Sequence, residues 1–368
     1  MPSAIIHYWL LNRRGGEKVL DSLCRLLPGA DIYTLFCDPR KLSEEVRRHK
    51  IVVSSLDPFR RWHRNLLPLM PMALEAFDLR GYDLIVSSES GPAKGVLAPS
   101  TARHICYCHT PMRYLWDLYP AYRNDWTRSR IKRALIAPFA HYMRLWDYAS
   151  AARVDTFIAN SRNVRTRIWK TYRRESEVIY PPVDVETFRH ERAENYFLAV
   201  SELVPYKRID LLVKHFTRTG QPLRIAGEGP DSRALRAAAG RNIQFLGRVS
   251  DADLRDLYAR CRAFLIPGEE DFGITPVEAL ASGKPVIAFG RGGALETVPP
   301  FGGVLFDRQD EESLAAAMSR FEQLEPEIQP DRLQQWTHQF STTEFERRMA
   351  AELTPAPGSE GQCSQPKS

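Results

Sequence analysis

GEEDFGITPVEALASGKPV, residues 268–286, is the stretch that decides the fold of this 368-residue chain. It follows an apolar run expected as a strand and leads into a second such run. Between the two lie an acidic loop and a short helix, which Thr275-Pro276 opens and Gly283 closes. A helix placed between two buried strands forms a parallel crossover, so the segment predicts an α/β fold.

The same alternation of strands and helices extends outward from this segment. Apolar runs expected as strands lie at 4–11, 31–37, 83–89, 103–109, 156–161, 196–201, 222–226, 243–247, 263–267, 285–289 and 303–306. Apolar residues at helical spacing lie at 17–27, 208–219, 231–239, 251–261 and 311–324. Strands interleaved with helices predict mostly parallel sheets covered on both faces.

The segment VIYPPVD (178–184) interrupts this alternation, because two adjacent prolines are compatible with neither a helix nor a central strand. We therefore expect two α/β domains, at 1–180 and 185–330. Helices at 331–353 are expected to pack back on the first domain, and 354–368 to form a disordered tail. Open α/β sheets bind ligands at the carboxyl ends of their strands, so a ligand cleft is expected between the domains.

The composition is that of a globular protein, with 43% hydrophobic and 26% charged residues. No apolar run reaches the roughly 18 residues that a membrane-spanning helix needs. The start MPSAIIHYWLLNRRGG is expected as a first strand instead of a signal peptide, since no basic stretch precedes its apolar run. Scattered cysteines favour reduced core thiols in a cytoplasmic protein. Cys106 and Cys108 are expected to point to opposite faces of their strand.

Charge is distributed unevenly along the chain. Residues 1–180 hold 29 Lys and Arg against 17 Asp and Glu, whereas 181–368 hold 22 against 28. The excess concentrates at 101–180, with 15 against 6. A basic half attracts an anionic partner such as a phosphate, a nucleic acid or an acidic membrane face. A merely solvated basic face is the alternative, and charge alone leaves both interpretations open.

Glu270 and Glu278 are the two residues of the opening segment that carry chemistry. Thr275 stands three residues before Glu278, which predicts a capping box in which Glu278 bonds the backbone at the helix start. Glu270 has no such explanation, because it lies in a glycine-flanked loop beside Asp271. A carboxylate there is suited to sugar hydroxyls, and the N–H groups of the helix start are suited to a diphosphate. From spacing alone, the binding and the capping interpretations are evenly matched.

This spacing resembles the Glu-x7-Glu signature of the retaining glycosyltransferases of family 4. The resemblance implies the GT-B fold, in which two Rossmann-like domains face each other across a cleft. It also implies that Glu270 contacts the transferred sugar and that Glu278 contacts the nucleotide ribose. The loop whose backbone amides would meet sugar and phosphate consists of Phe272, Gly273, Ile274 and Thr275.

Other segments resemble the same family in the same order, over about residues 1–350. Gly15-Gly16 resembles the glycine loop near the acceptor and diphosphate, with an ordinary tight turn as the alternative. GEGP (227–230) and FGRGGALETV (289–298) resemble two further family turns, the second near the donor. The stretch that wraps the nucleotide base corresponds to Gly247, Arg248 and Val249.

Lys207 and His109 complete the site that the resemblance implies. Lys207 corresponds to the lysine that binds the donor diphosphate, with a surface lysine at a helix start as the alternative. His109, in CHTPMRYLWDLYPAYR, corresponds to a histidine facing the donor sugar, with a structural histidine as the alternative. Glu202 departs from the family, which often carries Arg five residues before the lysine. Either Arg208 or another basic residue then supplies the second positive charge, or donor binding is weakened.

The string around His109, with PYKRIDL and EEDFGITPVEA, is similar to bacterial mannosyltransferases of O-antigen and exopolysaccharide assembly. This implies a retaining hexosyltransferase that uses GDP-mannose to extend a lipid-linked glycan in cell-surface polysaccharide synthesis. It would be peripheral on the cytoplasmic face of the plasma membrane, with no cofactor, metal or nucleic-acid partner. A UDP-sugar-dependent hexosyltransferase of the same fold and a non-catalytic sugar-nucleotide-binding subunit are the alternatives.

Two further features have competing interpretations. Asp251-Ala-Asp253 has the form of a metal-binding Asp-x-Asp motif, but it follows a natural N-cap, Ser250, and supplies an acidic first turn, so we expect no metal there. The stretch 57–77, with 128–133 and 139–146, mixes basic and large apolar side chains. It is suited to an anionic membrane face, or equally to a core helix with a basic outer surface.

Overall fold

The computed structural model describes residues 1–12, 15–120 and 130–354, without the side chains of 130–136. The chain forms two compact units. Unit 1 comprises residues 1–108, 112–158 and the chain from Thr343 onward, and unit 2 comprises 109–111 and 159–342. The expected disordered tail lies outside the described residues beyond Thr354, as does part of the basic stretch 128–133.

The first sheet has seven strands in the order β3-β2-β1-β4-β5-β6-β7. Their bounds are β1 Ser3–His7, β2 Asp31–Thr34, β3 Ile51–Val53, β4 Leu84–Glu89, β5 Arg103–Cys108, β6 Thr156–Ala159 and β7 Glu177–Val178. The neighbouring strands β3-β2-β1-β4-β5 pair in parallel. Ile5 of β1, for example, lies opposite Ile32 of β2 on one side and Val86 of β4 on the other. Strands β1 and β4 are buried along their whole length, as expected of a sheet covered on both faces.

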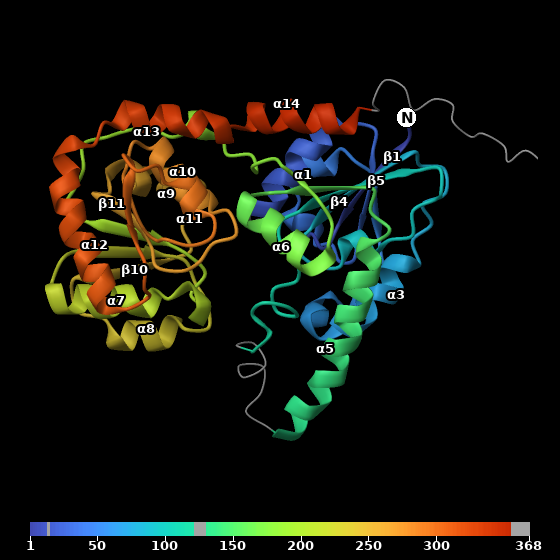
Figure 1. Cartoon of the computed structure of the whole chain (residues 1–368), viewed down its shortest axis with the longest axis horizontal. Helices are drawn as coiled ribbons and strands as arrows, with labels where there is room; N and C mark the ends of the chain where they lie inside the picture. The colour runs from blue at the N-terminus through green and yellow to red at the C-terminus, as the bar shows by residue number, and fades with distance from the viewer. Residues whose placement is uncertain (13–14, 121–129, 355–368) are drawn as a thin grey trace, which may run out of the picture. The chain divides into compact units, whose positions relative to one another are not determined.

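Helices and a long 3₁₀ segment surround the strands of unit 1. They are α1 Gly15–Leu26, α2 Glu44–Arg47, η2 Asp57–Leu69, α3 Met70–Glu75, α5 Arg130–Ala151 and α14 Thr342–Leu353. Figure 1 shows that α5 extends well beyond the sheet. No helix of the described residues is long and apolar enough to cross a membrane.

The second sheet has six parallel strands in the order β10-β9-β8-β11-β12-β13. Their bounds are β8 Phe197–Val200, β9 Leu223–Ala226, β10 Ile243–Gly247, β11 Ala263–Ile266, β12 Val286–Phe289 and β13 Gly303–Phe306. The helices of unit 2 are α6 Arg162–Tyr172, α7 Ile209–Thr219, α8 Ser232–Ala238, α9 Asp251–Arg260, α10 Ile274–Ala281, α11 Ala294–Thr297, α12 Glu311–Leu324 and α13 Pro330–Thr337.

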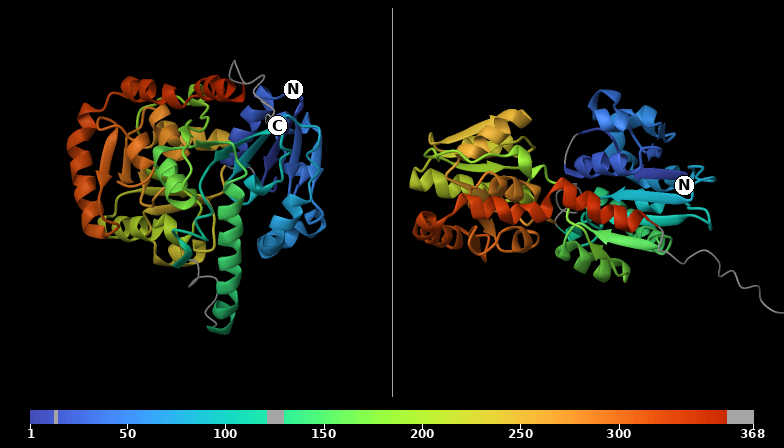
Figure 2. Two further views of the ribbon diagram at one scale, coloured as in Figure 1. Left: turned by 45° about the vertical axis from the view of Figure 1, so that its right-hand side comes forward. Right: turned by 90° about the horizontal axis from the view of Figure 1, so that it is seen from above.

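Alternating side chains of this sheet enter two separate cores. Phe197 and Leu265 pack with residues of α7 and α12, whereas Leu198 and Phe264 pack with residues of α9, α10 and α13. This is the two-residue period of a strand whose both faces are covered. Figures 1 and 2 show the helices on the two sides of the sheet. The expected α/β architecture of two parallel sheets is therefore present, and each expected strand has a counterpart.

The unit boundaries differ from the domain boundaries expected from the sequence. Helix α6 belongs to unit 2, although it precedes the linker at 178–184. In the segment 331–353, α13 stays in unit 2 and only α14 belongs to unit 1. Within unit 1, α14 is held by Glu346, whose carboxylate lies 2.6 Å from Arg25, and by the ring of Phe345 against Tyr107.

The described cysteines are buried and free. The expectation that Cys106 and Cys108 point to opposite faces is wrong. Residues two apart on a strand share a face, and these two side chains are hydrogen-bonded to each other. Burial raises the pKa of the Cys108 thiol well above its ordinary value, which keeps it protonated.

Candidate functional site

Glu270 and Lys207 meet in unit 2, although 63 residues separate them in sequence. Lys207 ends the 3₁₀ turn Pro205–Lys207, and Glu270 lies in the loop between β11 and α10. The Lys207 ammonium donates to both carboxylate oxygens of Glu270, at 2.6 Å each. Burial acts to lower the pKa of Lys207, but the interactions with Glu270, Tyr206 and Asp271 together outweigh it and raise that pKa above its ordinary value. The pair therefore places an ammonium group directly beside a carboxylate group.

Glycines at two positions make this meeting possible. A Cβ added to Gly268 would lie 2.9 Å from the Lys207 Cα, so only glycine lets the two backbones approach this closely. On the other side, the amide of Gly293 donates to the Glu270 carbonyl at 2.8 Å. A Cβ on Gly293 would lie 1.9 Å from the Phe272 carbonyl oxygen. The glycine turn of 289–298 thus holds the backbone of the acidic loop.

The expected capping box at the start of α10 is not formed. The helix begins at Ile274, and its N-cap is Gly273 with φ 90°, so Thr275 is already inside the first turn. A left-handed conformation is available to glycine at little cost, and it moves the helix start by one to two residues. Glu278 is buried instead, and its Oε2 accepts a hydrogen bond from the Tyr258 hydroxyl at 3.1 Å.

The amides at the start of α10 remain suited to an anion. The first N–H groups of a helix have no carbonyl partner within it, and here they follow directly on Glu270. Phe272 anchors this loop, because its ring is buried between Tyr180 and Phe340 with centroids 5.5 Å from each. The loop of Phe272, Gly273, Ile274 and Thr275 is therefore fixed at both ends.

Arg167 of α6 is a contact of the acidic loop that sequence reasoning missed. Its guanidinium donates to Glu269 Oε1 at 2.6 Å and also to Asp271 Oδ1. It lies 3.4 Å from the hydroxyl of Thr110, the residue after His109. No sequence signal marks it, because more than 100 residues separate it from its carboxylate partners.

The other residues expected in the site lie after β5, in α1 and at the end of β10. His109 directly follows β5 and is partly buried, and Gly16 lies in the first turn of α1. Gly247 ends β10 with φ 69°, and its carbonyl accepts the Gly227 amide at 2.8 Å. Arg248 is exposed and Val249 partly buried.

Arg208 does not join Lys207 and Glu270. It adopts a left-handed conformation with φ 54°, and its guanidinium is paired with Asp210 at 3.1 Å. The Asp-x-Asp pair likewise has a local role. Ser250 caps α9 through its hydroxyl, which accepts from the Asp253 amide at 3.1 Å. Among the described residues, no three His, Cys, Asp or Glu side chains gather in a way that could hold a metal ion.

Two family models match consecutive parts of the chain, which together span residues 13–338. The one described as Glycosyltransferase Family 4 matches residues 13–187, and the one described as Glycosyl transferases group 1 matches 184–338. This chain belongs to the family 4 glycosyltransferases. The two glutamates of its Glu-x7-Glu signature are Glu270, which is paired with Lys207, and Glu278, which is bonded to Tyr258.

Curated relatives support this assignment. The O-antigen chain mannosyltransferase RfbU of Salmonella typhimurium is 29% identical over 56% of this chain and 60% of its own length. A GDP-mannose-dependent mannosyltransferase of Corynebacterium glutamicum, which acts on a phosphatidylinositol monomannoside, is 35% identical over 31% of this chain and 34% of its own length. The chain thus spans only about a third to three fifths of these two relatives.

The structure of HepE from Anabaena in complex with UDP superposes with a TM-score of 0.70 at 17% identity, covering 96% of this chain and 99% of that one. At this identity the likeness shows the fold, and it confirms the two-domain GT-B architecture expected for a family 4 chain.

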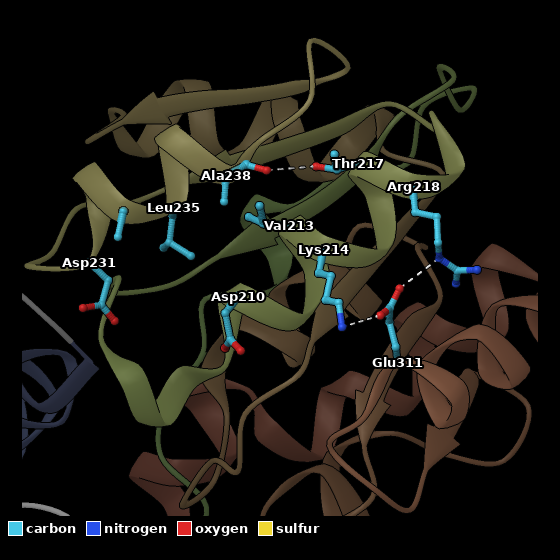
Figure 3. A pocket seen from close by; sticks show the side chains of 10 residues that line it. Asp210, Val213, Lys214, Thr217, Arg218, Asp231, Leu235, Ala238 and Glu311 are labelled. Atoms are coloured by element: carbon cyan, nitrogen blue, oxygen red, sulfur yellow. Dashed lines mark hydrogen bonds and ion pairs between the residues drawn. The ribbon is translucent and has the colours of Figure 1, made fainter.

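A groove of about 600 Å³ lies elsewhere on unit 2 of this family 4 chain, between α7 and α8 (Figure 3). Lys214 and Arg218 reach from α7 to Glu311 at its rim, 2.8 and 2.9 Å away. A neighbouring cavity of about 370 Å³ includes Arg208 in its lining. Neither lining contains Glu270 or Lys207, so these hollows are distinct from the site of the ion pair.

Proposed function

We propose that the protein is a retaining hexosyltransferase that transfers mannose from GDP-mannose to a lipid-linked glycan. The observation that carries this proposal is the Lys207–Glu270 pair, with 2.6 Å from the ammonium to each carboxylate oxygen. The pair lies where a parallel strand, β11, leads into a helix start, the position at which α/β sheets bind nucleotides. A cation for phosphate and an acceptor for sugar hydroxyls thus lie side by side.

These groups divide the work of transfer between them. Lys207 and the first amides of α10 stabilise the negative charge that grows on the leaving diphosphate. Glu270 accepts hydrogen bonds from the donor sugar, and His109 faces the same sugar. The bond from C1 to the diphosphate oxygen breaks while the acceptor oxygen bonds to C1. The acceptor proton passes to a leaving-group oxygen on the same face, so configuration at C1 is retained.

Support for mannose and GDP comes from the relatives. RfbU is an O-antigen chain mannosyltransferase, and the Corynebacterium protein is GDP-mannose-dependent. The HepE structure holds UDP, which keeps a UDP-sugar as the alternative donor. The contacts of Gly247, Arg248 and Val249 with the base would be largely backbone contacts, so they do not distinguish the nucleotides.

The acceptor part of the proposal rests on the surface of unit 1. Phe59, Trp62, Leu69 and Met72 expose between 45% and 67% of their surface, beside the exposed Arg61 and Arg64. Segment η2 has no buried residue, whereas α3, the second part of the stretch 57–77, is buried in the core of unit 1. The core-helix alternative therefore describes α3, and the exposed side chains of η2 carry the membrane proposal. Helix α5 adds exposed Tyr142, Leu145 and Tyr148. Apolar and basic side chains together favour binding at an anionic lipid surface, here the cytoplasmic face of the plasma membrane.

Calorimetric titration with GDP, UDP, ADP and their mannose and glucose conjugates tests the donor. The proposal predicts that GDP-mannose binds at least tenfold more tightly than any UDP-sugar. A preference for a UDP-sugar would change the proposed donor but leave the proposed transferase activity standing. Nucleotide-sugar binding without turnover on any lipid-linked glycan would instead favour the non-catalytic subunit, the alternative that Glu202 motivates.

A further inference from the structure

The acidic loop contains three consecutive carboxylates, Glu269, Glu270 and Asp271. Adjacent like charges repel and compete for the same cation. Lys207, however, forms its ion pair with Glu270, while the two flanking carboxylates contact a second cation, Arg167. Glu270 therefore has Lys207 as its cation, and its two neighbours share Arg167.

Arg167 is placed by the helix that carries it. Helix α6 begins at Ser161, whose hydroxyl caps the helix by accepting the Val164 amide at 3.0 Å and also donates to the Asp271 carbonyl at 2.7 Å. The amides of Arg162 and Asn163 donate to the Glu296 carboxylate at 2.8 and 2.9 Å. The helix start is thus bound to the acidic loop and to the glycine turn that supports it.

The guanidinium is suited to this division, because its planar fork can contact two carboxylates at once. Its side chain is largely buried, with 15% of its surface exposed, so the attraction is less screened than that of a surface pair. The same group lies 3.4 Å from Thr110, next to His109. The Arg167 side chain therefore contacts residues that are adjacent in sequence to two proposed site residues, Glu270 and His109.

We propose that Arg167 is a positioning residue of the transferase site, acting through Glu269 and Asp271 to leave Glu270 and Lys207 paired only with each other and with the donor. This inference rests on the proposed function. Without the guanidinium, Glu269 and Asp271 lose this cation and repel Glu270 more strongly, so the loop shifts and the Lys207–Glu270 pair moves with it. Misplacement of this kind lowers catalysis by about 10- to 100-fold.

The test compares Arg167→Met, Arg167→Lys and the triple variant Arg167→Met/Glu269→Gln/Asp271→Asn with wild type. Arg165→Met is the matched control, since Arg165 is exposed on the same helix. Turnover of GDP-mannose and calorimetric affinity for GDP-mannose are both measured, on protein shown to be folded by its unfolding temperature.

We expect Arg167→Met to lower kcat by about 10- to 100-fold and donor affinity by about tenfold, with Arg165→Met unchanged. The triple variant should recover most of both losses, because the competing charges are gone. Arg167→Lys should be intermediate, since one ammonium cannot span both carboxylates. A merely structural arginine would show no recovery in the triple variant. That result, or an Arg167→Met variant within twofold of wild type, overturns the inference.

If wild type binds donor but transfers nothing, the proposed transfer fails while Arg167 is still judged by the donor affinities. If wild type transfers mannose and Arg167→Met equals Arg165→Met, the transferase assignment stands and the positioning role is rejected. The two failures are thus distinguishable.

Discussion

The backbone amide of Gly293 donates to the carbonyl of Glu270 at 2.8 Å. The glycine turn that follows β12 therefore holds the acidic loop that follows β11. Because a Cβ on Gly293 would lie 1.9 Å from the Phe272 carbonyl oxygen, no other residue permits this contact. The position of the Glu270 backbone therefore depends on the absence of a side chain at Gly293.

Substitution Gly293→Ala should destabilise unit 2 by about 2 kcal/mol or more, because backbone atoms cannot move aside as flexible side chains can. It should also abolish donor binding, since Glu270 shifts with its carbonyl. Thermal unfolding and donor calorimetry measure the two effects. Gly29→Ala is the control, as a Cβ there meets nothing within 4 Å. Equal effects of the two variants would contradict this account.

Unit 1 contains a buried charge network that predicts a pH dependence of stability. The Lys94 ammonium lies 2.9 Å from Glu89 and also contacts Asp147, and all three side chains are fully buried. Burial raises the pKa of Glu89 from its ordinary 4.5 to about 7, although Lys94 opposes this rise. Between these two values the folded state holds more protons than the unfolded state, so stability falls as pH rises.

The unfolding temperature should therefore fall by several degrees between pH 5 and pH 8. Glu89→Gln cannot ionise, so it should flatten this dependence over the same window. Lys94→Met should instead destabilise the protein by about 3–5 kcal/mol at pH 8, because it leaves buried carboxylates without their cation. A pH profile of Glu89→Gln that matches wild type would refute the role given to Glu89.

The membrane proposal predicts a measurable loss when the exposed aromatic side chains of η2 are removed. Phe59→Ser/Trp62→Ser should weaken binding to vesicles with anionic lipid at least tenfold, because each ring buries apolar area in the interface. Leu295→Ser is the matched control, an equally exposed apolar residue of unit 2. Sedimentation with vesicles measures the partition. Equal binding of the two variants would show that η2 does not contribute to membrane binding.

Strands and helices with a clear apolar period could be predicted from the sequence, because burial dictates that period. Strands β3 and β7 could not, since three and two residues are too short to show it. The start of α10 was misplaced because the left-handed Gly273, which no pattern announces, replaces Thr275 as the cap. The separate roles of Lys207 and Glu270 were implied only through the family, and their mutual contact was not predicted. Arg167 could not be predicted, because its role depends on tertiary contacts between α6 and the acidic loop.

In the proposed transferase, Lys207 binds the diphosphate of the donor and Glu270 binds its sugar. Calorimetric affinities of wild type, Lys207→Met and Glu270→Gln for GDP and for GDP-mannose test these two roles directly. The account predicts that Lys207→Met weakens both ligands by about tenfold or more, as loss of a charge-assisted contact requires. It predicts that Glu270→Gln weakens GDP-mannose and leaves GDP within about threefold of wild type, a change below the cost of one such contact. A Glu270→Gln variant that binds GDP-mannose as tightly as wild type would contradict it.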